Sequence, residues 1–206
     1  ETSEFVDYGV PLPGASWPSS RLDPRRRMLY AAGFYAEFLA WDVDARRPLY
    51  AGQLPEGMTW SKRVMLLDVV TGMLYTSNGH SSDPGKNLIQ YDPERNRFRL
   101  LEAPMPADEV GEEHTVSVMR ASTSRRGPDG LFNGVTLTGQ MFTFAPEKEQ
   151  LVDRGYIWPG EQRYTTSLAR SGRYIYYLPG AHGKGSRDGS PLVQYDTKTE
   201  TRKVIA

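Results

Sequence analysis

One pattern returns four times along the 206 residues: an apolar run that ends in an aromatic residue, followed in three of the four cases by Asp. It reads FLAWD from Phe38, LIQYD from Leu88, MFTFA from Met141 and LVQYD from Leu192. The aromatic anchors Trp41, Tyr91, Phe144 and Tyr195 are 50, 53 and 51 residues apart. This regularity indicates repeats of one structural unit of about 50 residues.

Each repeat divides into four short strand-like runs. In the second repeat they are RVMLLDV, MLYTSNG, LIQYD and FRLLE, separated by Thr71-Gly72, a long polar loop and a turn at 93–96. Four-stranded units that recur every ~50 residues predict an all-β propeller, with each repeat forming one antiparallel blade. We expect about four blades, at approximately 15–55, 56–105, 110–158 and 161–206.

The first residues resemble the end of the third repeat. EFVDYGVPLPG at 4–14 is similar to QLVDRGYIWPG at 150–160, which predicts that residues 1–14 form the outer strand of a preceding blade. Four blades and one extra strand favour part of a larger ring of about six to eight blades, with a complete four-bladed ring as the alternative. Open sheet edges also predict self-association, or docking of the remaining blades of a longer chain.

The blade sequences TGMLYTSNG…LIQYDPERNRFRLL and SGRYIYYLPG…LVQYDTKTETRKVIA resemble bacterial β-propellers with NHL-like, YVTN-like or SMP-30-like blades. The resemblance covers nearly the whole chain and implies the propeller fold. It slightly favours a periplasmic or secreted location. It leaves the function open, because such blades occur in lyases, lactonases, oxidoreductases and binding scaffolds alike.

Composition excludes several classes of site. Lys and Arg together number 25, as do Asp and Glu, and without a long basic run we expect no nucleic-acid partner. The absence of Cys excludes disulfides and thiolate metal sites. No apolar stretch approaches the ~18 residues that a membrane span needs, so we expect none.

Strand direction predicts where a site lies. In an antiparallel blade, the starts of the first and third strands and the ends of the second and fourth share one face, here called the top face. An ungapped alignment of KRVMLLD, HTVSVMR and YTTSLAR places Lys62, His114 and Tyr164 at equivalent positions around the mouth of the central channel. Their side chains can transfer protons when burial or neighbours shift their pKa values, so they are the predicted catalytic residues.

Two long loops, SNGHSSDPGKN and PGAHGKGSRDGSP, bring His80 and His182 to the same face. His80, His114 and His182 are candidate ligands for a divalent metal, the one cofactor that the sequence suggests. The alternative is that His80 and His182 are solvated loop residues. The predicted ligand-binding residues are His80, His182, Arg163, Lys184, Arg187 and Trp60. By contrast, Asp42, Asp92 and Asp196 each follow a third strand, where Asp stabilises the turn by accepting hydrogen bonds from backbone amides.

These residues suit two functions. In the first, the propeller binds a carbohydrate or another small-molecule ligand at the channel mouth and acts as a polysaccharide lyase, or as a metal-assisted lyase or hydrolase. Such chemistry needs a cation for the carboxylate, a base and an acid. The alternative is a non-catalytic scaffold that binds a ligand or another protein. No strong catalytic motif is present, so the sequence does not decide whether the chain is an enzyme.

Overall fold

The structure is a computed structural model that describes residues 6–61, 64–78, 87–108, 115–116, 118–160, 163–180 and 189–206. It contains four four-stranded antiparallel sheets, in each of which the order of the strands along the chain is also their order in space. Blade 1 consists of β1 (Ser19–Asp23), β2 (Met28–Ala32), β3 (Glu37–Asp42) and β4 (Arg47–Gln53). Blade 2 consists of β5 (Leu66–Leu67), β6 (Leu74–Ser77), β7 (Asn87–Asp92) and β8 (Arg97–Pro104).

Blade 3 consists of β11 (Met119–Ser122), β12 (Phe132–Thr136), β13 (Gln140–Ala145) and β14 (Gln150–Tyr156), with a short 3-10 turn η1 (Pro146–Lys148). Blade 4 consists of β15 (Ala169–Ser171), β16 (Tyr174–Tyr177), β17 (Val193–Asp196) and β18 (Thr201–Val204). A separate two-stranded hairpin, β9 (Ala107–Asp108) with β10 (Thr115–Val116), lies between blades 2 and 3 in the chain and was not predicted.

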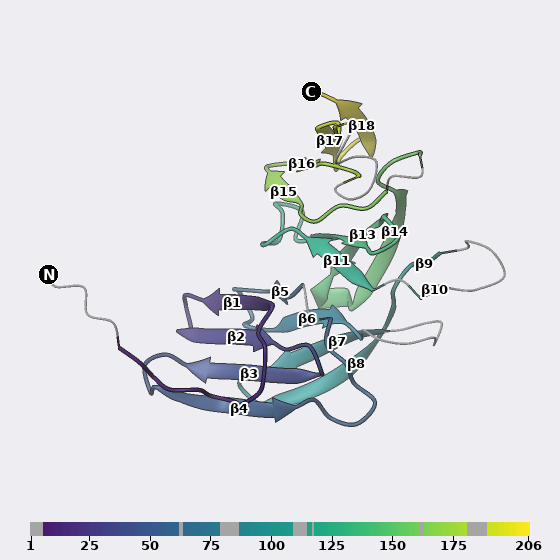
Figure 1. Cartoon of the computed structure of the whole chain (residues 1–206). Coiled ribbons are helices and arrows are strands. Elements are labelled where there is room, and N and C mark those ends of the chain that lie inside the picture. Colours follow the sequence, from purple (N-terminus) through teal and green to yellow (C-terminus); the bar gives the residue numbers. More distant parts are fainter. Residues whose placement is uncertain are drawn as a thin grey trace, which may run out of the picture.

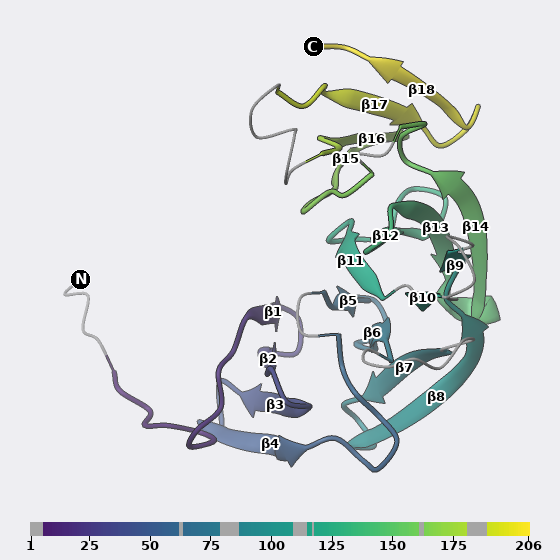
Figure 2. The ribbon, with the colours of Figure 1, turned by 45° about the vertical axis from the view of Figure 1, so that its right-hand side comes forward.

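The four sheets follow one another around an arc (Figure 1). The first strands β1, β5, β11 and β15 lie on the inner side of the arc, and the fourth strands β4, β8, β14 and β18 lie on the outer side (Figure 2). The predicted all-β propeller of about four blades is therefore confirmed. Among the described residues, no helix is long and apolar enough to cross a membrane.

The hairpins between third and fourth strands have a common design. Asp42 accepts hydrogen bonds from the amides of Asp44 and Ala45 at 3.0 and 2.8 Å, and Asp92 accepts from Glu94 and Arg95 at 3.0 and 3.1 Å. These bonds confirm the structural role predicted for the aspartates. Each hairpin then ends at a residue with left-handed backbone conformation, namely Arg46, Asn96, Glu149 or Glu200, with φ between 47° and 56°.

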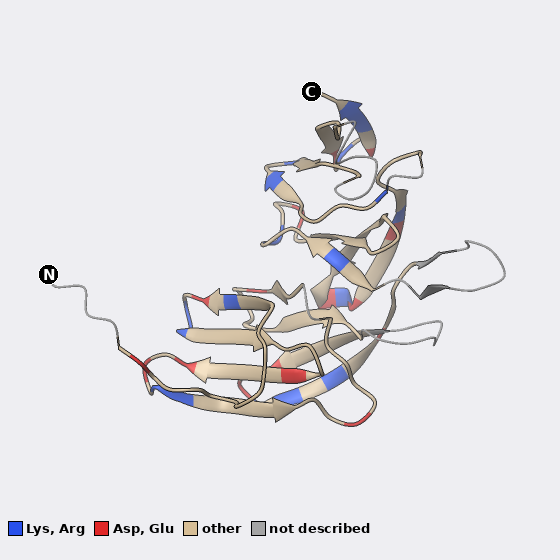
Figure 3. Ribbon diagram, in the orientation of Figure 1, with Lys and Arg blue, Asp and Glu red and all other residues tan. Residues whose placement is uncertain are grey.

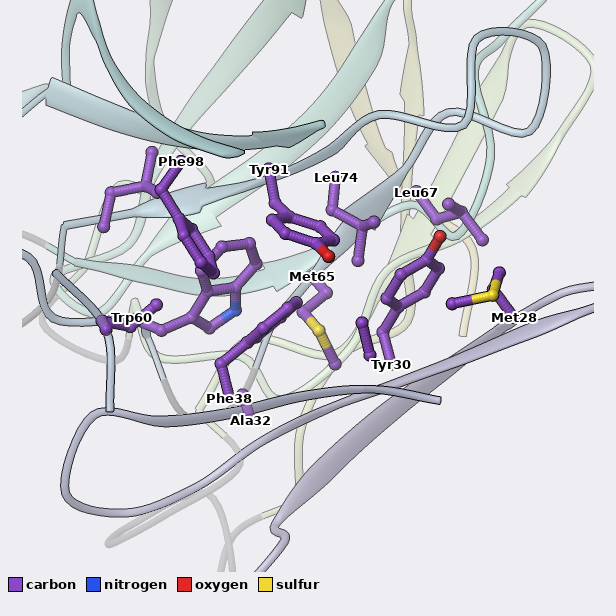
Figure 4. Close-up of a cluster of buried hydrophobic side chains, with 13 residues drawn as sticks. Met28, Tyr30, Ala32, Phe38, Trp60, Met65, Leu67, Leu74, Tyr91 and Phe98 are labelled. Carbon is purple, nitrogen blue, oxygen red and sulfur yellow. The ribbon is translucent and has the colours of Figure 1, made fainter. Parts of the chain in front are cut away.

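The aromatic anchors of the repeat fill the interfaces between blades. Tyr91 packs toward blade 1, with its ring centroid 4.9 Å from that of Phe38 (Figure 4). Phe144 packs toward blade 2, 5.0 Å from Tyr75, and Tyr195 belongs to the cluster between blades 3 and 4. The three clusters are separate, so each blade is stabilised mainly by packing against the blade or blades directly beside it.

Residues 6–18 form no strand in the structure. Tyr8 nevertheless contacts Trp41 of β3, with ring centroids 6.1 Å apart. The predicted place of residues 1–14, as the outer strand of a preceding blade, stays a prediction.

Candidate binding site between blades 3 and 4

Most of the predicted site lies outside the described residues. This applies to Lys62, His80, His114, His182, Lys184 and Arg187. Their predicted catalytic, ligand-binding and metal-binding roles stay predictions. Within the ranges that the structure describes, no three His, Asp or Glu side chains gather as a metal ion would require. Trp60, Arg163 and Tyr164 are the predicted site residues whose surroundings are described.

The backbone corrects the alignment that placed His114 beside Tyr164. The amide of Gly180 donates to the carbonyl of Tyr164 at 2.7 Å, and the amide of Leu137 donates to the carbonyl of Val118 at 2.8 Å. In each blade, the donor lies five residues after the second-strand residue that pairs with the aromatic anchor. Leu137 follows Phe132, which pairs with Phe144, and Gly180 follows Ile175, which pairs with Tyr195. Tyr164 therefore corresponds to Val118, and the ungapped alignment is wrong by four residues in blade 3.

The shift comes from the connections between second and third strands: residues 137–139 join β12 to β13 in blade 3, whereas residues 178–192 join β16 to β17 in blade 4. In addition, the register between β11 and β12 slips between Met119 and Ala121. The residues directly after His114, Thr115 and Val116, belong to β10, whereas the innermost strand of blade 3 begins at Met119. The expectation that His114 starts an innermost strand is thus wrong.

Trp60 is a core residue. It is 4% exposed, and its ring centroid lies 5.0 Å from that of Phe38 and 6.4 Å from that of Phe98 (Figure 4). This position suits packing between blades 1 and 2. A ligand on the surface cannot stack on a ring that is buried there.

Tyr164 meets an arginine that the sequence did not single out. Arg120 occupies the slipped position of β11, donates a hydrogen bond from Nε to the Tyr164 hydroxyl, and has its Cζ 4.8 Å from the Tyr164 ring centroid. Both side chains are half-buried. Because a β-bulge re-aims the side chain at the extra residue, the slip in register accounts for the reach of Arg120 from blade 3 to blade 4.

Arg163 forms a second arginine–tyrosine pair on the same face. Its Cζ lies 3.6 Å from the ring centroid of Tyr156, the last residue of β14, and its Nε donates to the carbonyl of Gly160 at 3.0 Å. Gly139 lies beneath it with φ 89°, and a Cβ there would come within 2.3 Å of the Arg163 Cβ. Glycine is required at 139 both for its conformation and for this close approach.

We call Arg120, Tyr156, Arg163 and Tyr164 the binding rim. Many other arginines pair with carboxylates, for example Arg99 with Glu149 and Arg154 with Glu200. Within the described part of the chain, no carboxylate lies within ion-pair distance of Arg120 or Arg163. Stacking on a tyrosine ring holds each guanidinium in place, and its positive charge can still attract and bind an anion.

The distribution of charged residues suits a small binding site for an anion better than a broad surface of one charge. Figure 3 shows acidic and basic positions interspersed along the arc, with basic positions on the inner strands β1, β11 and β15. Arg163 and Tyr164 were singled out from the sequence as predicted site residues, whereas Arg120 and Tyr156 were not. A bulge has no signature in the repeat, so nothing in the sequence distinguished Arg120 from other surface arginines.

No family model matches the sequence, and no curated protein matches it. Solved structures do. The WD40 repeats of RRP9 superpose with a TM-score of 0.61 at 13% identity, over 93% of this chain and 51% of that one. U3-55K gives a TM-score of 0.61 at 11% identity, over 93% of this chain and 52% of that one.

A third match is the extracellular domain of the putative one component system BT4673 from B. thetaiotaomicron. Its TM-score is 0.59 at 14% identity, over 91% of this chain and 22% of that one. The chain thus spans about half, or less, of the chains that it matches. Identities this low show the fold alone. Together with the four sheets, they show that the chain is an arc of about four β-propeller blades.

Proposed function

We propose that this chain is a non-catalytic propeller scaffold that binds an acidic segment of a protein partner at the binding rim. The observation that supports this is the pair of half-buried guanidiniums, Arg120 and Arg163, which stack on tyrosines of blades 3 and 4. Neither has a carboxylate partner among the described residues. An incoming Asp or Glu side chain would supply one.

The geometry lowers two costs of binding. Stacking and the bonds to Tyr164 and Gly160 already restrict the two arginines, so a ligand need not order them. Partial burial also reduces screening by water, which strengthens the attraction between a guanidinium and a carboxylate. Tyr156 and Tyr164 add aromatic surface of the kind found at the centres of protein interfaces.

The carbohydrate-binding and lyase function remains a second prediction. It depends on His114, Lys62, His80 and His182, all outside the described residues, together with Tyr164. No contact among the described residues favours it over the scaffold. The similar solved structures show the fold alone and carry no argument for catalysis.

A fluorescently labelled oligoglutamate peptide is the probe that tests the scaffold. We expect its anisotropy to rise on binding, and Arg120→Gln and Arg163→Gln each to weaken binding about tenfold, since a charge-assisted hydrogen bond contributes ~1.5–3 kcal/mol. Binding should also weaken with added salt. Arg25→Gln is the matched control, because Arg25 is exposed on the hairpin between β1 and β2, on the opposite face.

Equal binding by the double variant Arg120→Gln/Arg163→Gln would refute the proposed site. Binding of polygalacturonate instead of the peptide, with release of an unsaturated product that His114→Ala abolishes, would support the lyase prediction. An oligolysine peptide controls for nonspecific attraction and should not bind.

A further inference from the structure

Two serines of blade 2 bind the backbone of blade 3 directly before Arg120. The Met119 amide donates to the Ser77 Oγ at 2.8 Å, and the Ser61 Oγ donates to the Met119 carbonyl at 3.0 Å. The Ser61 amide donates in turn to the Ser77 carbonyl at 3.2 Å. Both backbone polar groups of Met119 are therefore bonded to serine side chains.

These hydrogen bonds lie in the interior. Ser77, Met119 and Ser61 are 0%, 1% and 6% exposed, respectively. Loss of one serine hydroxyl would leave a buried donor or acceptor of Met119 without its partner, which costs more than losing the same bond at the surface. The two serines thus hold Met119 firmly in one position.

The serine at 77 is a departure from the repeat. It lies three residues after Leu74, which pairs with the aromatic anchor of blade 2, and the equivalent positions in the other blades hold Ala32, Val135 and Leu178. A blade accepts an apolar residue there, so its fold does not require a hydroxyl. What the hydroxyl of Ser77 provides is the bond to Met119.

Holding Met119 also determines the direction of Arg120. The peptide groups on either side of Met119 are planar, and Ser77 binds the N–H of the first while Ser61 binds the carbonyl of the second. Fixing both planes fixes the two backbone dihedral angles of Met119, after which the chain enters Arg120. Arg120 itself has no partner in β12, because the register slips there. Its direction therefore depends on the bonds to Met119.

We propose that Ser77 and Ser61 are positioning residues of the binding rim, which hold Met119 so that Arg120 reaches Tyr164. The observed contact is the hydrogen bond from the Arg120 Nε to the Tyr164 hydroxyl, with Cζ 4.8 Å from the ring centroid. The effect on binding rests on the proposed function: without a serine hydroxyl, Arg120 gains freedom, and an acidic ligand must order it at a cost in affinity.

The first measurement needs no ligand. The full chain is labelled with fluorotyrosine, and the fluorine NMR resonance of Tyr164 is identified by its loss in Tyr164→Phe. Arg120→Gln should shift this resonance, because it removes the guanidinium from the ring. We expect Ser77→Ala and Ser61→Ala to shift it in the same direction.

Thr76→Val is the matched control. Thr76 precedes Ser77 in β6, is 0% exposed, and donates from Oγ1 to the Val64 carbonyl at 2.7 Å. The variant removes a buried hydroxyl of blade 2 that does not bond to Met119, so the Tyr164 resonance should not move. Urea denaturation measures the folding cost of each variant. If Ser77→Ala does not fold, Ser61→Ala carries the comparison, because it removes the other bond to Met119.

The second measurement uses the labelled oligoglutamate peptide. We expect Ser77→Ala to weaken binding about fourfold, less than the loss for Arg120→Gln, because the guanidinium is still present. In an Arg120→Gln background, Ser77→Ala should change the affinity less than about twofold, since its effect passes through Arg120. In an Arg163→Gln background, the full effect of Ser77→Ala should remain.

The two measurements separate this inference from the proposed function. An unmoved Tyr164 resonance in both serine variants would overturn the inference, even if the peptide binds. So would a loss of affinity on Ser77→Ala that persists in the Arg120→Gln background, because it would act by another route. A resonance that moves as expected, in a chain that does not bind the peptide, would refute the proposed function and support the positioning of Arg120 by the serines.

Discussion

Arg126 of blade 3 forms an ion pair with the buried carboxylate of Asp68, which follows the innermost strand of blade 2. The Asp68 side chain is 1% exposed and that of Arg126 is 15% exposed. Asp68 also accepts hydrogen bonds from the Val70 amide, at 3.1 Å, and from the Thr71 hydroxyl. The arginine therefore joins two blades and neutralises a carboxylate that organises a turn.

Arg126→Met should lower the free energy of unfolding by ~3 kcal/mol, because it leaves the Asp68 charge buried without its partner. Methionine is similar in length but removes the guanidinium, which also pairs with the exposed Glu147 and lies 5.8 Å from the Phe132 ring centroid. Urea denaturation followed by tryptophan fluorescence measures the change. Arg125→Met alters an exposed neighbour and should change stability by less than ~0.5 kcal/mol. Similar effects from both variants would contradict the ion-pair account.

Gly127 and Arg170 make a second contact between blades, and it depends on the absence of a side chain. A Cβ at position 127 would lie 1.9 Å from the Arg170 Cζ. Arg170 cannot move away freely, because its side chain is 8% exposed and pairs with Asp129 at 2.8 Å. We expect Gly127→Ala to cost ~1–3 kcal/mol through overpacking.

A double-mutant cycle checks this explanation. In an Arg170→Ala background, Gly127→Ala should cost little, giving a coupling energy above ~1 kcal/mol. Gly52→Ala is the matched control, since a Cβ at Gly52 would have no atom within 4 Å. Additive effects of the two substitutions would show that Gly127 is required for another reason.

The fold was largely predictable because the residues that carry it recur. Trp41, Tyr91, Phe144 and Tyr195 mark one position of the third strand, and three of them fill the interface with the preceding blade. Packing between successive blades therefore imposes the period that the sequence shows. Among the described residues, the β9–β10 hairpin has no equivalent in the other repeats, so the repeat gave no signal for it.

The site was less predictable because it depends on departures from the repeat. Tyr164 was a predicted site residue, but its partner Arg120 lies at a slip in register, which the repeat does not reveal. Arg163 stacks on Tyr156 only because Gly139 permits close approach. Contacts of this kind are determined by backbone geometry, which composition and spacing do not report.

Asn133 offers a prediction of increased stability. It is 0% exposed, and among the described residues neither its Oδ1 nor its Nδ2 has a hydrogen-bond partner. Its position in β12 corresponds to that of Tyr75 in β6, which faces the next blade. Asn133→Leu should raise the free energy of unfolding by ~1–2 kcal/mol, because it removes two buried polar groups at similar volume.

Asn78→Leu is the control for that substitution. The Asn78 Oδ1 accepts from the Thr59 amide at 2.8 Å, so its loss should destabilise the protein by ~1–2 kcal/mol. Opposite signs for the two variants in urea denaturation are the expected result. Destabilisation by Asn133→Leu would indicate that water satisfies the asparagine.

The buried tyrosines predict loss of stability in alkali. Burial, with a smaller contribution from Asp23, raises the pKa of Tyr30 well above its usual value of 10.0. Burial likewise raises the pKa of Tyr91. Because the folded-state pKa is the higher one, the contribution to stability is complete below the unfolded pKa of ~10 and is lost as the pH rises toward the folded value.

Tyr30→Phe tests this directly, since the Tyr30 hydroxyl has no hydrogen-bond partner among the described residues. Above pH ~10, each such tyrosine steepens the fall of unfolding free energy by ~1.4 kcal/mol per pH unit, and the variant should remove one such increment. Near neutral pH it should cost less than ~0.5 kcal/mol of unfolding free energy.

Tyr91→Phe should reduce the alkaline slope of unfolding free energy equally but cost ~1 kcal/mol at neutral pH, because the Tyr91 hydroxyl donates to Asn96 at 2.8 Å. Urea midpoints measured from pH ~8 to ~11 distinguish the two variants, and an unchanged alkaline slope in both would show that these hydroxyls are not buried in the folded protein.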